Sequence, residues 1–261
     1  MGDSRRIITL LTDFGLRDHF VAAMKGVILS VNPDVTLVDI SHLVPPLDLF
    51  SGAFTLGQAY SCYPAGSIHL AVVDPEVGTS RKALAVSAGG HFFVAPDNGI
   101  LSFVYKAEPD YSAYEITSDH YFRKPVSATF HGRDIFAPIA AWISRDIPLH
   151  QIGPRVPEPE RLYIPAPKRV KEALIQGTIL AVDQFGNLIT NLVPAEVPRT
   201  SRILAGKREI MSFRAAYAEG APEEVFIVPG STGYLEIAMK NGSAASALGL
   251  KSGAPIGVVL V

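Results

Sequence analysis

Three residues in two short stretches of the chain have side chains that could orient a small nucleophile. Asp74 begins the stretch DPEVGTSR, and Arg81 ends it seven residues later. Gly78 allows a tight loop that returns the guanidinium to the carboxylate, although an ion pair that only stabilises a loop would have the same pattern. His131, in TFHGRDIFAP, precedes a helical pattern, and the positive end of a helix dipole favours a neutral imidazole. Such an imidazole can orient or deprotonate water, and it can equally be a hydrogen-bonded structural residue.

Two turns carry polar groups that could bind the remainder of a ligand. Asp13, in LTDFG, follows a short apolar run, and its carboxylate could accept hydrogen bonds from both hydroxyls of a ribose. An aspartate that caps a helix or a turn gives the same pattern. Asp183 and Asn187, in DQFGN, occupy the predicted turn of a β-hairpin, where Gly-Asn needs no functional explanation. None of these signals is specific when taken alone.

Missing motifs and the charge balance argue against several classes of protein. The sequence has no GxxxxGK[ST] phosphate loop, no GxGxxG after its first predicted strand, no HExxH and no GxSxG. Lys+Arg 23 against Asp+Glu 25 gives a formal net charge of -2, so neither nucleic acid nor a membrane surface is an expected partner. We predict no bound metal and no cofactor.

The single cysteine and the hydropathy indicate the compartment. Cys62 excludes an internal disulfide, fits a reducing environment and is predicted to be a half-buried structural thiol. The N-terminus is polar, and no apolar run approaches the ~18 residues that a membrane span requires. The sequence therefore predicts a cytoplasmic, soluble protein.

Alternating strand and helix patterns in the first half must position these residues. Strands are predicted at 7–11, 35–40, 67–73, 83–87 and 92–95, and helices at 20–31, 48–60, 98–105 and 135–143. This alternation favours a largely parallel sheet covered on both faces, whose ligands bind beyond the carboxyl ends of the strands. Asp13 and Asp74 both lie at such ends.

The second half has a different pattern. Prolines between 153 and 167 mark a linker or domain edge, and short strands follow at 178–182, 188–192, 201–204, 225–228, 235–238 and 256–261. Little helix is predicted among them, as in a small β-barrel or sandwich. The predicted fold class is α/β: an N-terminal α/β sandwich over residues 1–160 with a mostly parallel sheet, and a C-terminal all-β, barrel-like domain over residues 170–261.

Taken together and in order, the motifs closely resemble those of the S-adenosylmethionine hydroxide adenosyltransferases, which are relatives of fluorinating and chlorinating enzymes. The similar stretches are LTDFG, KGVILSVNPDVTLVDISH, PAGSIHLAVVDPEVGT, TFHGRDIFAP, DQFGN and GYLEIAMKNGSAA, spread over nearly the whole chain. The resemblance implies hydrolysis of S-adenosyl-L-methionine to adenosine and L-methionine by attack of water at C5′. It also implies a homotrimer in which substrate binds where the first domain of one subunit meets the second domain of its neighbour.

The resemblance also implies roles for individual residues. The implied catalytic set is Asp74, Arg81 and His131, which hold the water. Our hypothesis is that the arginine and the histidine orient this water while the aspartate takes its proton. The implied substrate-binding residues are Asp13 at the ribose hydroxyls, Asp18 near the methionine amino group, Tyr63 against the sugar, Phe130, Asp183 at the methionine end, Asn187 at the adenine edge, and Ser231, Tyr234, Glu236 and Asn241 in the second domain.

Two departures from the halogenating relatives favour water as the nucleophile. Leu47 stands at the position of their tryptophan, and His131 with Gly132 stands where they have tyrosine and serine. Two alternatives remain: a non-catalytic sensor that binds S-adenosylmethionine or adenosine, and a chloride-dependent adenosyltransferase. The complete catalytic set argues against the sensor, while Leu47 and Gly132 argue against chloride.

Overall fold

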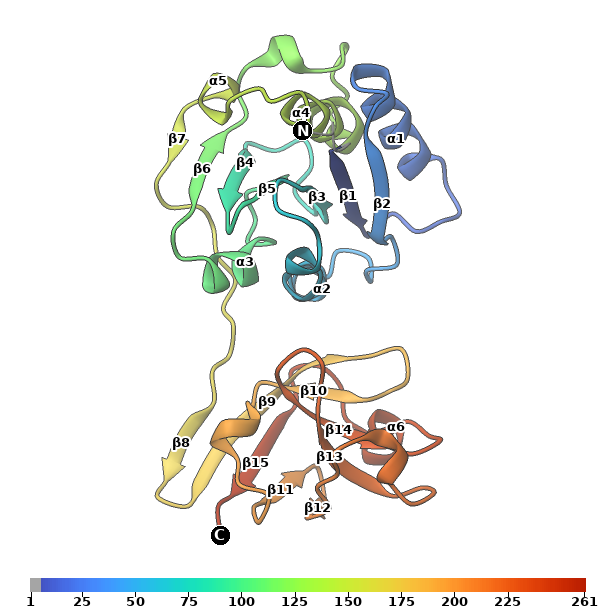
Figure 1. Cartoon of the computed structure of the whole chain (residues 1–261), viewed down its shortest axis with the longest axis vertical. Coiled ribbons are helices and arrows are strands. Elements are labelled where there is room, and N and C mark those ends of the chain that lie inside the picture. The colour runs from blue at the N-terminus through green and yellow to red at the C-terminus, as the bar shows by residue number, and fades with distance from the viewer. Residues whose placement is uncertain (1–5) are drawn as a thin grey trace. The chain divides into compact units, whose positions relative to one another are not determined.

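The chain folds into two compact units, which we describe separately. The computed structural model describes residues 6–261; the first unit ends at Tyr163, and the second is Ile164–Val261 (Figure 1). The ranges 1–160 and 170–261 stay our proposal for the domain bounds. None of the helices within residues 6–261 has the length and hydropathy needed to cross a bilayer.

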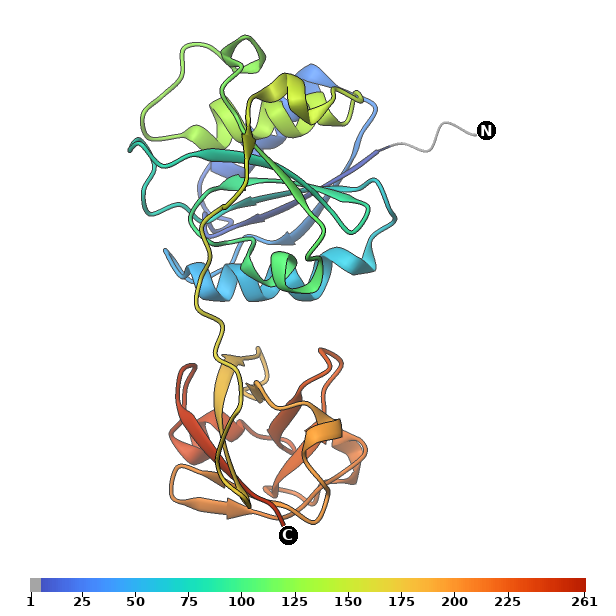
Figure 2. The same ribbon diagram turned by 90° about the vertical axis from the view of Figure 1, so that its left-hand side faces the viewer.

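The first unit is a sheet with helices on both faces. The strand order is β2-β1-β3-β5-β4-β6-β7. The strands are β1 (Ile7–Thr12), β2 (Thr36–Ser41), β3 (Ile68–Val72), β4 (Ala83–Ala88), β5 (His91–Pro96), β6 (Ser112–Glu115) and β7 (Arg155–Val156). The helices are α1 (Phe20–Val31), α2 (Leu49–Ala59), α3 (Ser102–Ala107), α4 (Ala137–Ile143) and α5 (Leu149–Ile152). Figure 2 shows α1 and α4 on one face of the sheet and α2 and α3 on the other.

The parallel part of this sheet confirms the predicted fold class. Strands β2, β1, β3 and β5 run parallel to one another, and β4 pairs with β5 in the antiparallel sense. Strand β3, inside the parallel part of the sheet, is buried along its whole length, as expected of a strand covered on both faces. Helix α1 packs Met24 and Ile28 into the same core, and it ends where Asn32 N donates to Ile28 O before Pro33.

Two predicted helices begin elsewhere than expected. The helix predicted over 98–105 is α3, which begins only at Ser102, because Asn98 Oδ1 accepts a hydrogen bond from Ile100 N and holds a turn. The helix predicted over 135–143 is preceded by a π-helical turn at Gly132–Phe136.

Cys62 was wrongly predicted to be half-buried: it is an exposed free thiol after α2.

The second unit is an antiparallel, barrel-like sheet, as predicted. Its order is β12-β11-β15-β9-β10-β14-β13, with β8 also paired to β9. The strands are β8 (Lys168–Lys171), β9 (Leu174–Val182), β10 (Leu188–Thr190), β11 (Arg202–Ala205), β12 (Arg208–Ile210), β13 (Val225–Pro229), β14 (Leu235–Met239) and β15 (Pro255–Val259). A short helix, α6 (Ala244–Leu248), follows β14 and is capped by Ser243, whose Oγ accepts a hydrogen bond from Ser246 N.

A buried histidine pair should make the first unit sensitive to acid. His69 Nδ1 lies 2.8 Å from Thr9 Oγ1, and its Nε2 lies 3.2 Å from His91 Nδ1. Burial, followed by the neighbouring His91, lowers the pKa of His69 to about 3. Because the unfolded chain protonates this side chain near its ordinary value of 6.5, the unfolded state binds more protons between about pH 6.5 and 3, and stability falls with falling pH.

We therefore expect His69→Phe to flatten this dependence. The free energy of unfolding of the parent protein should fall towards that of the variant by about 1.4 kcal/mol for each pH unit below 6.5. Urea unfolding at several pH values from 7.5 to 4.5 measures both proteins. A difference that stays constant with pH would mean that His69 is not kept neutral by the fold.

Candidate functional site

The Asp74 carboxylate and the Arg81 guanidinium form a buried pair just beyond the carboxyl end of β3. Arg81 Nε donates to Asp74 Oδ1 at 2.9 Å and Nη2 to Oδ2 at 2.5 Å. Each side chain is only 5% exposed. The guanidinium also lies over the ring of Phe136, 5.1 Å from its centroid. The pair is therefore bidentate and shielded, which fixes both groups in one orientation.

The loop between the two residues has the tight turn that the sequence predicts. Gly78 adopts φ +84°, in the region that favours glycine. A Cβ there would lie 2.4 Å from the carbonyl oxygen of Ala128. The close approach places the Arg81 loop beside the segment that leads to His131.

His131 completes the cluster from the start of the π-helical turn. Arg81 Nη2 lies 3.0 Å from His131 Nδ1. Because a guanidinium can only donate, Nδ1 is the acceptor and the ring proton is assigned to Nε2. Burial, followed by the charge of Arg81, lowers the pKa of His131. The imidazole is therefore neutral at neutral pH and offers Nε2–H to a ligand.

Asp13 lies at the carboxyl end of the neighbouring strand, β1. Its carboxylate is half-buried, and Oδ2 accepts a hydrogen bond from the backbone N–H of Leu47 at 2.8 Å. Leu47 has φ +64°, which is uncommon for a leucine, and its side chain is 62% exposed. Because β1 and β3 are adjacent and parallel, Asp13 and Asp74 lie at the same edge of the sheet.

The other residues predicted for the first domain differ in their surroundings. Phe130 is buried, with its ring 6.0 Å from Phe14 and 5.2 Å from Phe20. Tyr63 is half-buried, and its ring lies edge-on to His69, 5.6 Å away. Asp18 is exposed in the loop before α1, and no hydrogen bond or ion pair of its side chain occurs within residues 6–261. The structure thus brings Asp74, Arg81 and His131 into direct contact, whereas Asp18 forms no hydrogen bond or ion pair with any of them.

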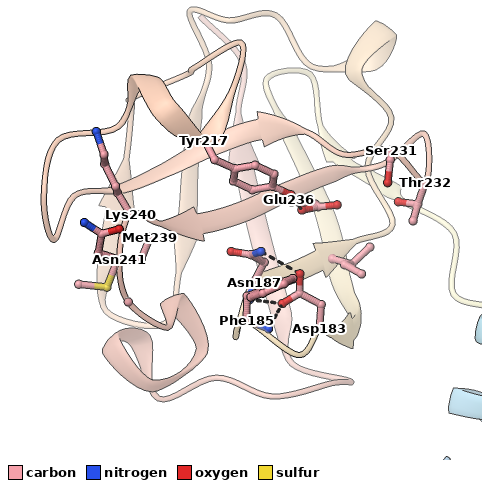
Figure 3. A pocket seen from close by; sticks show the side chains of 12 residues that line it. Asp183, Phe185, Asn187, Tyr217, Ser231, Thr232, Glu236, Met239, Lys240 and Asn241 are labelled. Atoms are coloured by element: carbon pink, nitrogen blue, oxygen red, sulfur yellow. Dashed lines mark hydrogen bonds between the residues drawn. The ribbon is translucent and has the colours of Figure 1, made fainter.

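The second unit contains a pocket of about 870 Å³ that is lined mainly from β10, β14 and the loops beside them. Five of the predicted residues line it: Asp183, Asn187, Ser231, Glu236 and Asn241. In Figure 3 the first four gather with Tyr217 and Thr232, while Asn241 is drawn at the other end with Met239 and Lys240. The predicted Tyr234 is not among the lining residues.

A hydrogen-bonded turn presents Asp183 and Asn187 to this pocket. Asp183 Oδ1 accepts from the backbone N–H groups of Phe185 and Asn187 at 2.9 and 2.8 Å. Its Oδ2 accepts from Asn187 Nδ2 at 2.8 Å. The carboxylate therefore has a fixed position, and Asn187 keeps its amide oxygen for a ligand.

Glu236 is the second carboxylate of the pocket. Only 4% of the residue is exposed, and its Oε2 accepts a hydrogen bond from the hydroxyl of Tyr217 at 2.5 Å. Burial raises the pKa of Glu236, and the charge of Asp183 adds to that shift. Within the described residues of this unit, no Lys, Arg or His forms an ion pair with Glu236 or Asp183. Lys240 also lines the pocket, but its ammonium donates to the carbonyl oxygen of Ala218. Two carboxylates at a cavity that form no ion pair favour a positively charged ligand.

Sequence reasoning missed Tyr217, Phe185 and Thr232 as lining residues. Tyr217 lies in RAAYAEG, which has no motif, and its place in the pocket depends on a hydrogen bond to a side chain 19 positions away. Phe185 is within the DQFGN motif, and a large aromatic in a predicted turn is the sequence signal that could have identified it; its side chain is 77% exposed. Over residues 6–261, no cluster of three His, Cys, Asp or Glu side chains is arranged to hold a metal ion.

Known proteins with similar sequences and structures cover nearly the whole chain. Models of the SAM hydroxide adenosyltransferase N-terminal and C-terminal domains match residues 8–153 and 177–257. A Salinispora tropica protein named (R)-S-adenosyl-L-methionine hydrolase is 39% identical over 94% of this chain and 95% of its own. A Nocardia brasiliensis protein named fluorinase is 29% identical over 72% of this chain and 71% of its own. A crystal structure of an uncharacterized conserved protein from Thermotoga maritima has a TM-score of 0.90 and 35% identity, covering 97% of this chain and 99% of that one.

Proposed function

Because the chain belongs to the SAM hydroxide adenosyltransferase family, we propose that it hydrolyses (R)-S-adenosyl-L-methionine to adenosine and L-methionine. The observation that carries this proposal is the contact of Asp74, Arg81 and His131 beyond the carboxyl end of β3. A buried, mutually oriented acid, cation and neutral imidazole suits the activation of a small neutral nucleophile such as water.

The reaction is a displacement at C5′. The water oxygen forms a bond to C5′, the C5′–S bond breaks, and its electron pair goes to sulfur, which leaves as the neutral thioether of methionine. Since the sulfonium is already a good leaving group, the main task is to hold the oxygen about 3–3.5 Å behind C5′ and in line. Such positioning can supply up to roughly 7–11 kcal/mol of the barrier.

The three side chains divide this task. His131 Nε2–H donates a hydrogen bond to the water oxygen, because Nδ1 is already occupied by Arg81. The remaining N–H groups of the guanidinium orient the same oxygen. Asp74 accepts the proton of the water, using a lone pair that its bond to Arg81 leaves free.

The chloride-using alternative is less well supported. Gly132 is buried, and a Cβ there would lie 3.3 Å from Met24 Sδ and 3.4 Å from the rings of Phe14 and Phe130. The backbone at this position therefore leaves little room for the serine that the halogenating relatives have. Leu47, at the position of their tryptophan, likewise provides no aromatic side chain to line a halide site.

The pocket of the second unit suits the methionine half of the substrate. In this proposal, the carboxylates of Asp183 and Glu236, which form no ion pair within the unit, attract its ammonium and sulfonium charges, while Asn187 binds the adenine edge. Ser231, Tyr234 and Asn241 are proposed to complete the contacts, as Asp13, Asp18, Tyr63 and Phe130 do at the ribose side.

We expect Glu236→Gln to weaken binding of the cationic substrate selectively. Loss of one of two negative charges should raise KM for the substrate about tenfold, and the inhibition constant of neutral adenosine should change less than about threefold. Steady-state kinetics with adenosine as inhibitor measure both values. Glu209→Gln, at an exposed Arg202 pair in the same unit, is the control and should have no effect. Equal weakening of the binding of substrate and adenosine would mean that the charge of Glu236 does not favour the cationic ligand.

The assembly and compartment are part of the same proposal. We propose a cytoplasmic homotrimer in which the second domain of one subunit completes the site of another; the family resemblance supports the trimer, and the single thiol supports a reducing compartment. Light scattering after size-exclusion chromatography tests the trimer, since three copies of 28.0 kDa differ clearly from one.

The function is tested by separate incubation with each sulfonium epimer of S-adenosyl-L-methionine, with and without chloride. Adenosine and methionine from the R epimer at a rate independent of chloride would support the proposal. A chloride-dependent 5′-chloro-5′-deoxyadenosine product would instead establish the halide transferase. Tight binding without any product would establish the sensor.

A further inference from the structure

A histidine that the predicted site does not include lies directly behind Asp13. His42 follows β2 and is buried, and its Nδ1 lies 2.8 Å from the hydroxyl of Thr12, the last residue of β1. Its Nε2 lies 3.0 Å from Asp39 Oδ1, although it is poorly aligned for a hydrogen bond. The Asp39 carboxylate favours the ring proton on Nε2, so Nδ1 accepts the proton of the Thr12 hydroxyl.

The same histidine fixes the turn that carries Asp13 at two points. Thr12 Oγ1 accepts a hydrogen bond from the backbone N–H of Phe14 at 3.2 Å, so the hydroxyl connects that amide to His42. The backbone carbonyl of His42 accepts from Gly15 N at 2.8 Å, where Gly15 has φ +70°. The residues on both sides of Asp13 are thus tied to His42, and the peptide planes that set its Cα–Cβ direction cannot rotate freely.

The carboxylate of Asp13 is held from the other side by the segment that follows His42. Leu47 N donates to Asp13 Oδ2, and Asp48 then caps α2 by accepting from Ser51 N at 3.0 Å. The stretch from His42 to the start of α2 therefore contacts the turn at its backbone and at its carboxylate. Binding of a vicinal diol requires both oxygens of one carboxylate to face the two hydroxyls, so orientation of this side chain directly affects affinity.

We propose that the Asp39–His42–Thr12 chain positions Asp13 for the two ribose hydroxyls, which makes Thr12 and His42 positioning residues. The proposal rests on the role of Asp13 in the proposed function. The proposal explains why the polar side chain of His42 is buried, which costs free energy and has no other role in the reaction.

The same strand offers a matched control. Thr9 and Thr12 both lie in β1, both are fully buried, and both hydroxyls lie 2.8 Å from the Nδ1 of a buried histidine, His69 and His42 respectively. Only Thr12 also accepts a hydrogen bond from the turn that carries Asp13. Thr9→Val and Thr12→Val therefore remove the same kind of bond, but only the second should affect the ribose.

The experiment measures discrimination between adenosine and 2′,3′-dideoxyadenosine as competitive inhibitors of the full-length protein. Thr12→Val should reduce the preference for adenosine roughly tenfold, with dideoxyadenosine nearly unaffected. Thr12→Ser should restore the preference, because it keeps the hydroxyl. Thr9→Val should lower the melting temperature without changing the preference. If Thr12→Val fails to fold, His42→Gln gives the same test, because its amide cannot reach the Nδ1 position.

Asp13→Asn separates failure of this inference from failure of the proposed function. If Asp13→Asn loses the preference while Thr12→Val keeps it, the positioning role is overturned and the role of Asp13 stands. If the unsubstituted protein binds both nucleosides equally, or if Asp13→Asn keeps the preference, the positioning role and the proposed role of Asp13 at the ribose are both overturned. Equal weakening of the two nucleosides in Thr12→Val would show a general structural effect and would also overturn the positioning role.

Discussion

Asp74→Asn should lose hydrolysis by roughly 10²–10⁴-fold in kcat while it still binds adenosine. The amide keeps the size of the side chain and an oxygen for Arg81, but it cannot accept the proton of the attacking water. Since the proposed contacts with adenosine are made by other side chains, among them Asp13 and Asn187, the dissociation constant of adenosine should change less than about threefold. Single-turnover kinetics and calorimetric titration with adenosine measure the two quantities.

Asp146→Asn is the control for this change. Asp146 also pairs with an arginine, through a contact of 2.5 Å to Arg6 Nη2, but 73% of its side chain is exposed. The control should keep full activity. Hydrolysis within about threefold of the parent rate by Asp74→Asn would show that the carboxylate takes no part in moving the proton.

Arg81→Ala should damage both stability and activity. It leaves the Asp74 carboxylate, only 5% exposed, without its charge partner, and breaking a buried pair in this way costs about 3–5 kcal/mol. It also frees His131 Nδ1, so the ring loses the contact that fixes its tautomer. The expected result is a free energy of unfolding lower by that amount and a kcat at least about 10²-fold lower. Urea unfolding and steady-state kinetics measure the two effects.

A second substitution separates the two effects of Arg81→Ala. In the double variant Asp74→Asn with Arg81→Ala, the buried charge is gone, so stability should partly recover while activity should not. Arg6→Ala, at the exposed pair with Asp146, should lower stability by less than about 1 kcal/mol. An Arg81→Ala protein as stable and as active as the parent would contradict the account of the cluster.

The sequence allowed the main elements to be predicted where burial is continuous. The strands β1 and β3 are runs of buried and mostly apolar residues, and Asn32-Pro33 marks the end of α1. Four strands were not predicted, since they are only two to four residues long: β6, β7, β8 and β12. Strand β8, KRVK, is also fully exposed. Such segments have no apolar periodicity, and they become strands through pairing with neighbours.

Local contacts of the site could be predicted better than distant ones. The return of Arg81 to Asp74 followed from Gly78 in a seven-residue interval. The contact of Thr12 with His42 depends on the pairing of β1 with β2, and that of Tyr217 with Glu236 depends on how a loop folds over β14. Neither follows from spacing along the chain, because tertiary pairing brings the side chains together.

The most direct test of the central claim is hydrolysis of S-adenosyl-L-methionine in ¹⁸O-labelled water, followed by mass spectrometry of the adenosine. The account predicts one labelled oxygen in the 5′-hydroxyl of adenosine and none in methionine, because water attacks C5′ while the C5′–S bond breaks. Adenosine without the label, or no adenosine at all, would contradict attack of water on C5′ by the Asp74, Arg81 and His131 cluster.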